Sequence, residues 1–197
     1  IYGIKGANGV LVVKTRRGEQ GKPKINVRLE TGMQTPVRTP KFLNAYESLQ
    51  LVKEAHTNDG TLSDFPYTED DMIAFRDHTD PIMYPDINWI DYCMNKASFQ
   101  SQHNVNISGG TNNMRYFVST GLFTQGGMFK KLGADNNANF DYKRYNYRAN
   151  LDFDVTKSTT LSVNIGGRVD TKRTPESGED QNQLFRKLYW AVPFAGA

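Results

Sequence analysis

Few of the 197 residues have the types and spacing that chemistry requires. The best candidate is the stretch 135–141, in which oxygen-bearing side chains alternate as they do at the start of a calcium-binding loop. These side chains are Asp135, Asn137, Asn139 and Asp141. The sixth position of the loop is Phe140 where glycine is needed, and the twelfth is Asn146 where glutamate is needed. We therefore interpret the stretch as a solvated polar loop.

A run of carboxylates at Glu69, Asp70 and Asp71 is the second candidate, since paired carboxylates can act as acid and base. The run directly follows Thr68. Threonine followed by acidic residues is typical of the first turn of a helix, whose amide dipoles favour negative charge. We therefore predict that these residues cap a short helix beginning at Thr68 and do not form a catalytic site.

The remaining reactive side chains are isolated in the sequence. The three histidines, His56, His78 and His103, share no metal-ligand spacing. Cys93 is the only cysteine, so neither an intrachain disulfide nor a cysteine-based zinc site can form. No nucleophile elbow, triad order or zinc-binding helix motif occurs. We expect no enzyme and no catalytic, cofactor or metal residues, while substrate-binding residues cannot be assigned.

The opening segment is rich in glycine. Gly3, Gly6 and Gly9 allow tight turns before the short apolar run 10–13. Their spacing fits neither the dinucleotide nor the nucleotide phosphate loop, which disfavours phosphate binding. The polar stretch 18–23 follows and is interpreted as a hinge, with Pro23 acceptable just before a strand but not inside a central one.

The elements that position these residues are most visible in the 27 residues from 144 to 170. Two runs of strict alternation are joined by the turn-forming stretch 156–159. The apolar positions of the first run are Tyr145, Tyr147, Ala149, Leu151, Phe153 and Val155. Those of the second run are Leu161, Val163, Ile165, Gly167 and Val169. The pattern predicts an antiparallel hairpin with one apolar and one polar face.

Three further strands are predicted, at 24–33, 100–108 and 114–124. In the first two, apolar and polar residues alternate. The third has apolar residues at both odd and even positions, so the sequence does not show which of its sides faces the apolar surface. The connections are alternately long and short: 34–99, 109–113, 125–141 and the turn at Lys157. The first, at 66 residues, is too long to be a bare connection, and we predict helices capped by Asn44 and by Thr68 within it.

A membrane barrel accounts for both the strand lengths and the loops. Roughly 9–11 alternating residues cross the hydrocarbon, with aromatic side chains near the interfaces. Tyr142, Tyr145 and Tyr147 gather at one end of the hairpin, as such a girdle would. Outer-membrane barrels also have short periplasmic turns and long extracellular loops. A soluble sandwich has no reason to sort its loops by end, so the barrel is favoured.

The amino-acid composition is compatible with a membrane barrel. A mean hydropathy of −0.62 looks soluble, but a barrel strand needs apolar residues only at alternate positions. No run of about 18 apolar residues occurs, which excludes a transmembrane helix. The net charge of +3 is too small to indicate nucleic acid. Five strands are fewer than the roughly eight of the smallest closed membrane barrel, so we expect a fragment.

A family resemblance supports the same interpretation. The stretch 1–18, IYGIKGANGVLVVKTRRG, resembles the end of the plug domain in TonB-dependent outer-membrane transporters. It is most similar to the SusC/RagA-like branch of Bacteroidetes-type bacteria. Segments similar to that branch's early barrel follow in order at 43–47, 88–89, 105–110, 115–119 and 144–151. The resemblance covers nearly the whole chain.

The resemblance implies a fragment of a plugged transmembrane antiparallel β-barrel of about 22 strands. Residues 1–20 would be the C-terminal end of the plug, and residues 21–197 the first barrel strands and extracellular loops, with short helices in the first loop. The implied function is TonB-dependent import of oligosaccharides or peptides across the bacterial outer membrane. The implied partners are a SusD-like surface lipoprotein, outer-membrane lipid, and the TonB–ExbB–ExbD energy complex acting through an upstream segment.

One alternative of another class remains open at this stage. A secreted β-sandwich could bind glycans, with Trp89 and the tyrosines as stacking surfaces for sugar rings. It predicts a water-soluble fragment, whereas the barrel predicts a fragment that needs detergent because one face is apolar.

Overall fold

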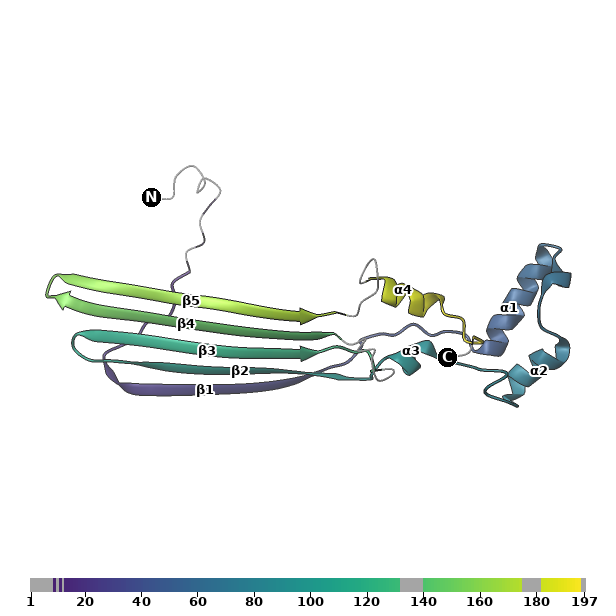
Figure 1. Ribbon diagram of the computed structural model, residues 1–197, viewed down its shortest axis with the longest axis horizontal. Helices are drawn as coiled ribbons and strands as arrows, with labels where there is room; N and C mark the ends of the chain where they lie inside the picture. Colours follow the sequence, from purple (N-terminus) through teal and green to yellow (C-terminus); the bar gives the residue numbers. More distant parts are fainter. Residues whose placement is uncertain (1–8, 10, 12, 132–139, 175–181, 196–197) are drawn as a thin grey trace. The chain divides into compact units, whose positions relative to one another are not determined.

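The computed structural model describes residues 9, 11, 13–131, 140–174 and 182–195. Five strands form one sheet in which each strand pairs with its neighbours in chain order (Figure 1). The strands are β1 (Gly21–Gln34), β2 (Ser98–Gly110), β3 (Met114–Gly126), β4 (Asp141–Thr156) and β5 (Thr159–Arg173). All five predicted strands are confirmed, and each extends beyond the predicted residues at one end or at both.

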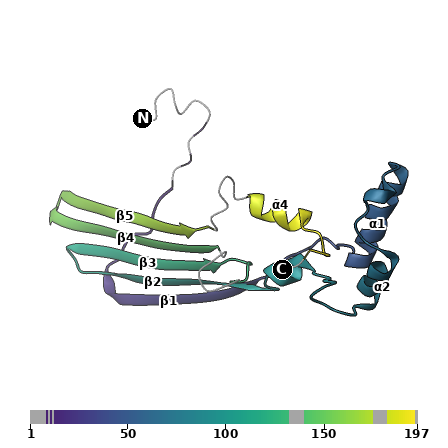
Figure 2. The same ribbon diagram turned by 45° about the vertical axis from the view of Figure 1, so that its right-hand side comes forward.

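The connections are sorted by length, as predicted. Residues 111–113 and 157–158 make the two short turns, which lie at the same end of the sheet (Figure 2). The long connections, 35–97 and 127–140, leave from the other end. An up-and-down sheet with short turns on one side is the arrangement found in outer-membrane barrels.

The predicted hinge at 18–23 is wrong in its second half. β1 begins at Gly21, so Pro23 lies inside a strand. β1 has a strand on only one side within the described sheet. Proline has no backbone N–H. It is tolerated in an edge strand because no neighbouring strand needs that donor on the unpaired side.

The first long connection carries helices where the sequence predicts them. α1 (Ala45–Asn58) begins after Asn44, whose side chain accepts a hydrogen bond from the Glu47 amide while Glu47 reaches back to the Asn44 amide. α2 (Glu69–Asp77) begins after Thr68 with the same reciprocal bonds to Asp71. Two orphan amides are satisfied at each start, which fixes both boundaries.

Three further helical elements complete the described secondary structure. They are the 3-10 turn η2 (Leu62–Asp64), α3 (Trp89–Cys93) and α4 (Asn182–Trp190). α4 was not predicted, although Leu184 and Leu188 have the four-residue spacing of a helix face. No helix in the described part of the chain is long and apolar enough to span a membrane.

The described chain divides into two compact units, one built around the strands and the other around the helices with the strand residues that adjoin them. The helical unit has two small cores. In one, Ala45 and Leu49 of α1 pack on Met72 and Phe75 of α2. In the other, Ile90 of α3, Phe129 and Leu188 of α4 come together. The segment that follows β5 therefore packs into the loops that precede β2 and β4.

Candidate functional site

The polar face of β4 and β5 carries the buried polar side chains of the strand unit. Asn150 and Asp152 retain only 1% and 6% of their surface, although they are polar residues on a single-layer sheet. They are buried because the segment 15–18 lies over them. Buried polar groups must be hydrogen-bonded to be tolerated, so the contacts of these two side chains define how the segment is held.

Asp152 is the centre of the first set of contacts. It accepts hydrogen bonds from the Arg17 guanidinium, with which it forms an ion pair, and from the Ser162 hydroxyl at 2.5 Å. Arg17 also donates to Asn164 Oδ1 at 3.2 Å. One arginine thus joins the N-terminal segment to both β4 and β5 across 135 residues of sequence.

Asn150 holds the backbone of the same segment. Its Nδ2 donates to the Arg16 carbonyl at 2.6 Å and to Thr15 Oγ1 at 3.3 Å. The Arg16 guanidinium lies 5.9 Å from the centre of the Phe117 ring, a distance that allows a cation–π contact. Phe117 is 7% exposed, and its contact with Arg16 shows that it lies on the face of β3 covered by segment 15–18. The sequence had left the facing of this strand open.

Gly18 allows the segment to approach the sheet closely. A Cβ at this position would overlap the backbone of Tyr116 on β3, so only glycine fits without displacement. The segment therefore rests directly on the sheet, and its side chains are held by β4 and β5.

A second ion pair ties three strands together on the same face. Arg115 of β3 donates twice to Asp154 of β4, at 2.9 and 3.0 Å, and Thr160 of β5 donates to the same carboxylate at 2.7 Å. A bidentate guanidinium–carboxylate pair fixes geometry more strongly than a single contact. It holds the strands in register close to the two short turns.

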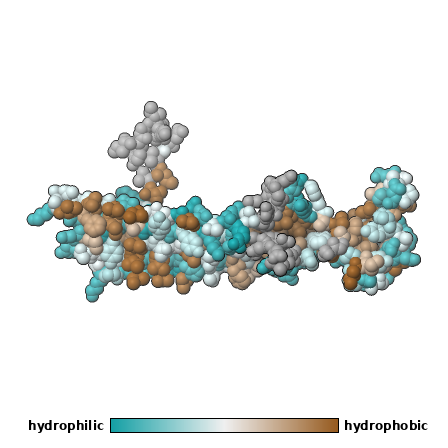
Figure 3. Space-filling view, in the orientation of Figure 1, coloured by the Kyte–Doolittle hydropathy of each residue, from teal (hydrophilic) through white to brown (hydrophobic). Residues whose placement is uncertain are grey.

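The opposite face of the sheet is apolar and exposed. In Figure 3, hydrophobic side chains, coloured brown, gather over the strands. Val27 of β1 is 58% exposed, and Ile165 of β5 is 53% exposed. Others on this face are Ile25, Leu29, Met33, Val118, Tyr145, Tyr147, Val155, Leu161 and Val169. A soluble monomer rarely exposes so long a run of apolar side chains.

One member of the expected tyrosine girdle lies elsewhere. Tyr145 and Tyr147 are exposed on the apolar face, as predicted. Tyr142 differs from them in parity and lines a cavity together with Gln34 and Gln125. Grouping it with the other two was therefore wrong, because strand neighbours an odd number of residues apart point to opposite faces.

The acidic run at the start of α2 caps the helix, as predicted. Asp71 accepts hydrogen bonds from the Thr68 hydroxyl at 2.6 Å, the Thr68 amide at 2.8 Å and the Tyr84 hydroxyl at 3.0 Å. These donors, the Thr68 hydroxyl first, lower the pKa of Asp71, and the bond to Asp71 raises the pKa of Tyr84. Asp71 therefore stays ionised and has no acid to supply at neutral pH.

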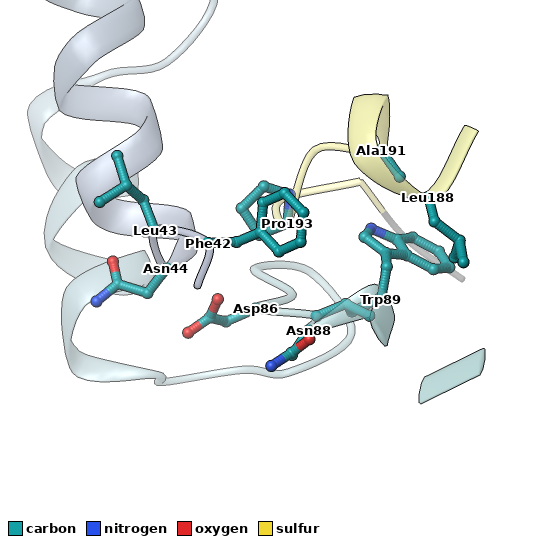
Figure 4. A pocket seen from close by; sticks show the side chains of 10 residues that line it. Phe42, Leu43, Asn44, Asp86, Asn88, Trp89, Leu188, Ala191 and Pro193 are labelled. Atoms are coloured by element: carbon teal, nitrogen blue, oxygen red, sulfur yellow. The ribbon is translucent and has the colours of Figure 1, made fainter. Parts of the chain in front are cut away.

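A small cavity of about 180 Å³ lies between the start of α1 and the end of the chain (Figure 4). Its polar groups are already engaged: Asp86 accepts from the Ala45 amide at 2.8 Å, and Trp89 Nε1 donates to the Val192 carbonyl at 3.0 Å. The alternative hypothesis of a glycan-binding β-sandwich needs Trp89 as a surface on which sugar rings stack. Trp89 instead packs within the loops as a structural residue.

The other candidate residues remain scattered. His56 contacts Thr61 at 3.0 Å, His103 contacts Ser101 at 3.2 Å, and Cys93 is half-buried, which raises the pKa of its thiol. Among the described residues, no three histidine, cysteine or acidic side chains come together as metal ligands do. Most of the calcium-like stretch 135–141 lies outside the described residues.

No family model matches the chain. It is, however, 30% identical over 155 residues to TonB-dependent receptor P26 of Formosa agariphila, which covers 77% of this chain. It is 26% identical over 172 residues to TonB-dependent receptor P3 of the same organism, which covers 87%. The chain is homologous to part of the TonB-dependent receptors. It spans only 14% of the length of these two curated relatives, and the homology assigns it to the bacterial outer membrane.

Solved structures share the fold of this chain. A chain of the RagAB peptide importer in the "closed-closed" state matches with a TM-score of 0.62 and 19% identity, over 90% of this chain and 21% of that one. The "open-open" state gives a TM-score of 0.63 at 20% identity, over 88% and 20%. The predicted resemblance is thereby confirmed, as homology to TonB-dependent receptors and as a fold shared with the RagAB importer.

Sequence reasoning missed the residues that join the N-terminal segment to the sheet. The sequence pattern assigned no partner to Arg17 in the opening segment or to Asp152 in the predicted hairpin. One signal was available: Asp152 and Asp154 share the polar parity of one strand, and carboxylates that become buried require cationic partners. The sequence could not show that one partner lies in the opening segment.

Proposed function

We propose that this chain belongs to an active importer that carries oligosaccharides or peptides across the outer membrane. Residues 1–20 would end the plug domain, and residues 21–197 would open the barrel. The observation that carries the proposal is the difference between the two faces of the sheet. One face is apolar and exposed, as a lipid-facing wall must be, and the other is polar and covered by segment 15–18.

The location of segment 15–18 supports a plug that closes the lumen. The segment contacts the sheet through Asn150 and Asp152, near the short-turn end of β4. In outer-membrane barrels the short turns face the periplasm, the side from which TonB acts. A SusD-like lipoprotein would then meet the opposite end of the strands, from which the long connections leave.

The alternative of a secreted β-sandwich is disfavoured. A sandwich covers one face of each sheet with a second sheet, whereas the described residues form a single sheet. Trp89, which it needs as a free stacking surface, donates its N–H to a backbone carbonyl within the loops.

Uptake in living cells tests the proposal. We expect deletion of the upstream TonB-contact segment of the full-length protein to abolish uptake of labelled cargo while leaving binding nearly unchanged. Binding uses preformed surfaces, whereas opening the lumen requires work supplied through TonB. A substitution in the same segment that preserves TonB binding is the matched control. Undiminished uptake after the deletion, or after collapse of the proton gradient, would instead indicate a passive pore.

A further inference from the structure

A larger cavity lies on the polar side of the strand ends from which the long connections leave. Its volume is about 450 Å³, within the usual range of roughly 300–1,000 Å³ for small-ligand pockets. Residues from β1, β3, β4, β5 and α4 line it together with residues of the connections. It is separate from the contacts of segment 15–18 and from the cavity beside Trp89.

The wall of this cavity is aromatic. Phe129 is the centre, with its ring 5.2 Å from that of Phe185 and 6.0 Å from that of Phe140, measured between ring centres. Met94 and Met128 extend the apolar wall. Phe129 is 3% exposed and belongs to the core of the helical unit, whereas Phe185 on α4 is 38% exposed. The wall is thus anchored on one side and accessible on the other.

The floor of the cavity is a chain of glutamine side chains across β1, β2 and β3. Gln34 Nε2 donates to Gln100 Oε1 at 2.7 Å, and Gln125 Nε2 donates to Gln34 Oε1 at 3.2 Å. Gln34 and Gln125 both line the cavity. Within the described part of the chain, Gln125 Oε1 accepts no hydrogen bond from a side chain, so it is available to an N–H group of a ligand.

We infer that this cavity binds an apolar amino-acid side chain of a peptide cargo, with Gln125 accepting a backbone N–H beside it. The inference rests on the proposed import function and narrows its substrate class. An apolar side chain gains from leaving water for a phenylalanine and methionine wall. A sugar ring would bury hydroxyl groups against the phenylalanine and methionine side of the cavity, which offers them no hydrogen-bond partners. The polar lining residues are confined to the strand ends: Gln34, Gln125, Asp141, Tyr142, Lys172 and Arg173. The apolar wall therefore selects against a glycan.

Binding to the purified full-length importer tests the inference. Two fluorescent peptides of equal length and charge serve as probes, one with leucine and phenylalanine side chains and one with serine and glycine. Phe185→Ser removes the accessible part of the wall. Trp190→Ser is the matched control, because Trp190 is a 68% exposed aromatic residue on the same helix that does not line the cavity.

We expect Phe185→Ser to weaken binding of the apolar peptide roughly tenfold and binding of the polar peptide little, since a large apolar side chain loses much of its contact. Trp190→Ser should change neither affinity. Equal affinities for all variants would overturn the inference, as would tighter binding of an oligosaccharide than of either peptide. Lower thermal stability of Phe185→Ser with unchanged binding would show that the cavity is packing space of this chain.

Failure of this inference can be told apart from failure of the import function. If uptake depends on the TonB-contact segment but is insensitive to Phe185→Ser, the import function is supported and the peptide-binding cavity is refuted. If uptake is independent of that segment, the import function fails whatever the cavity binds.

Discussion

Replacing Val27 by arginine should strongly reduce the amount of protein that assembles in the outer membrane. Val27 lies at the middle of β1, on the apolar face, and is 58% exposed in the described sheet. If that face meets lipid, the substitution places a guanidinium near the bilayer midplane. The cost there is about 2–4 kcal/mol, a large part of the stability of an ordinary protein.

Asn26→Arg is the matched control, because Asn26 is the adjacent residue of the same strand and points to the polar face. It should assemble almost as well as the unsubstituted protein. The measurement is the folded fraction in outer-membrane extracts, read from the mobility difference between folded and heat-denatured barrels in gels. Equal tolerance of both substitutions would mean that the exposed apolar face does not meet lipid.

Arg17→Ala should release segment 15–18 from the sheet. Its loss leaves Asp152, which is 6% exposed, with the Ser162 hydroxyl as its remaining side-chain donor among the described residues. Hydrogen bonds to charged groups contribute about 1.5–3 kcal/mol each, and exposure of the Arg17 side chain favours the lower part of that range. Backbone amides of the segment should then exchange with deuterium at least about tenfold faster in the full-length protein.

Two further variants separate this effect from general destabilisation. Arg28→Ala removes an exposed pair with Glu30, a residue of its own strand, and should change exchange in segment 15–18 little. The double variant Arg17→Ala/Asp152→Ala should unfold less readily than Arg17→Ala alone, because no buried carboxylate is left without its cation. Unchanged exchange in Arg17→Ala would show that the ion pair does not hold the segment.

The local rules of the sequence were sufficient for the strands and the first helices. Alternation fixed the two faces of β4 and β5, since a strand of the opposite parity would place Leu151 on the polar face and Arg144 on the apolar face. Asn44 and Thr68 located the starts of α1 and α2 because a capping side chain acts within three residues. Each of these signals operates over a few neighbouring residues.

The contacts in the candidate site join residues that are far apart in the sequence, so sequence patterns could not predict them. Arg17 and Asp152 meet across 135 residues, and no periodicity links a basic residue in the opening segment to one carboxylate in β4. The facing of β3 was open for the same reason, because the contacts that distinguish Phe117 from Val118, such as the one with Arg16, come from residues distant in the sequence. α4 was missed because nine residues give a weak helical pattern on their own.

The central claim is that these strands cross the outer membrane with the long connections outside and the short turns inside. Cysteine labelling of the full-length protein on intact cells tests it most directly, after Cys93→Ser removes the native thiol. Ser63→Cys in the first long connection and Lys157→Cys in the β4–β5 turn are both at exposed positions. A membrane-impermeant maleimide should label Ser63→Cys on intact cells and label Lys157→Cys only after the outer membrane is permeabilised. Labelling of both on intact cells, or of Lys157→Cys alone, would contradict this topology.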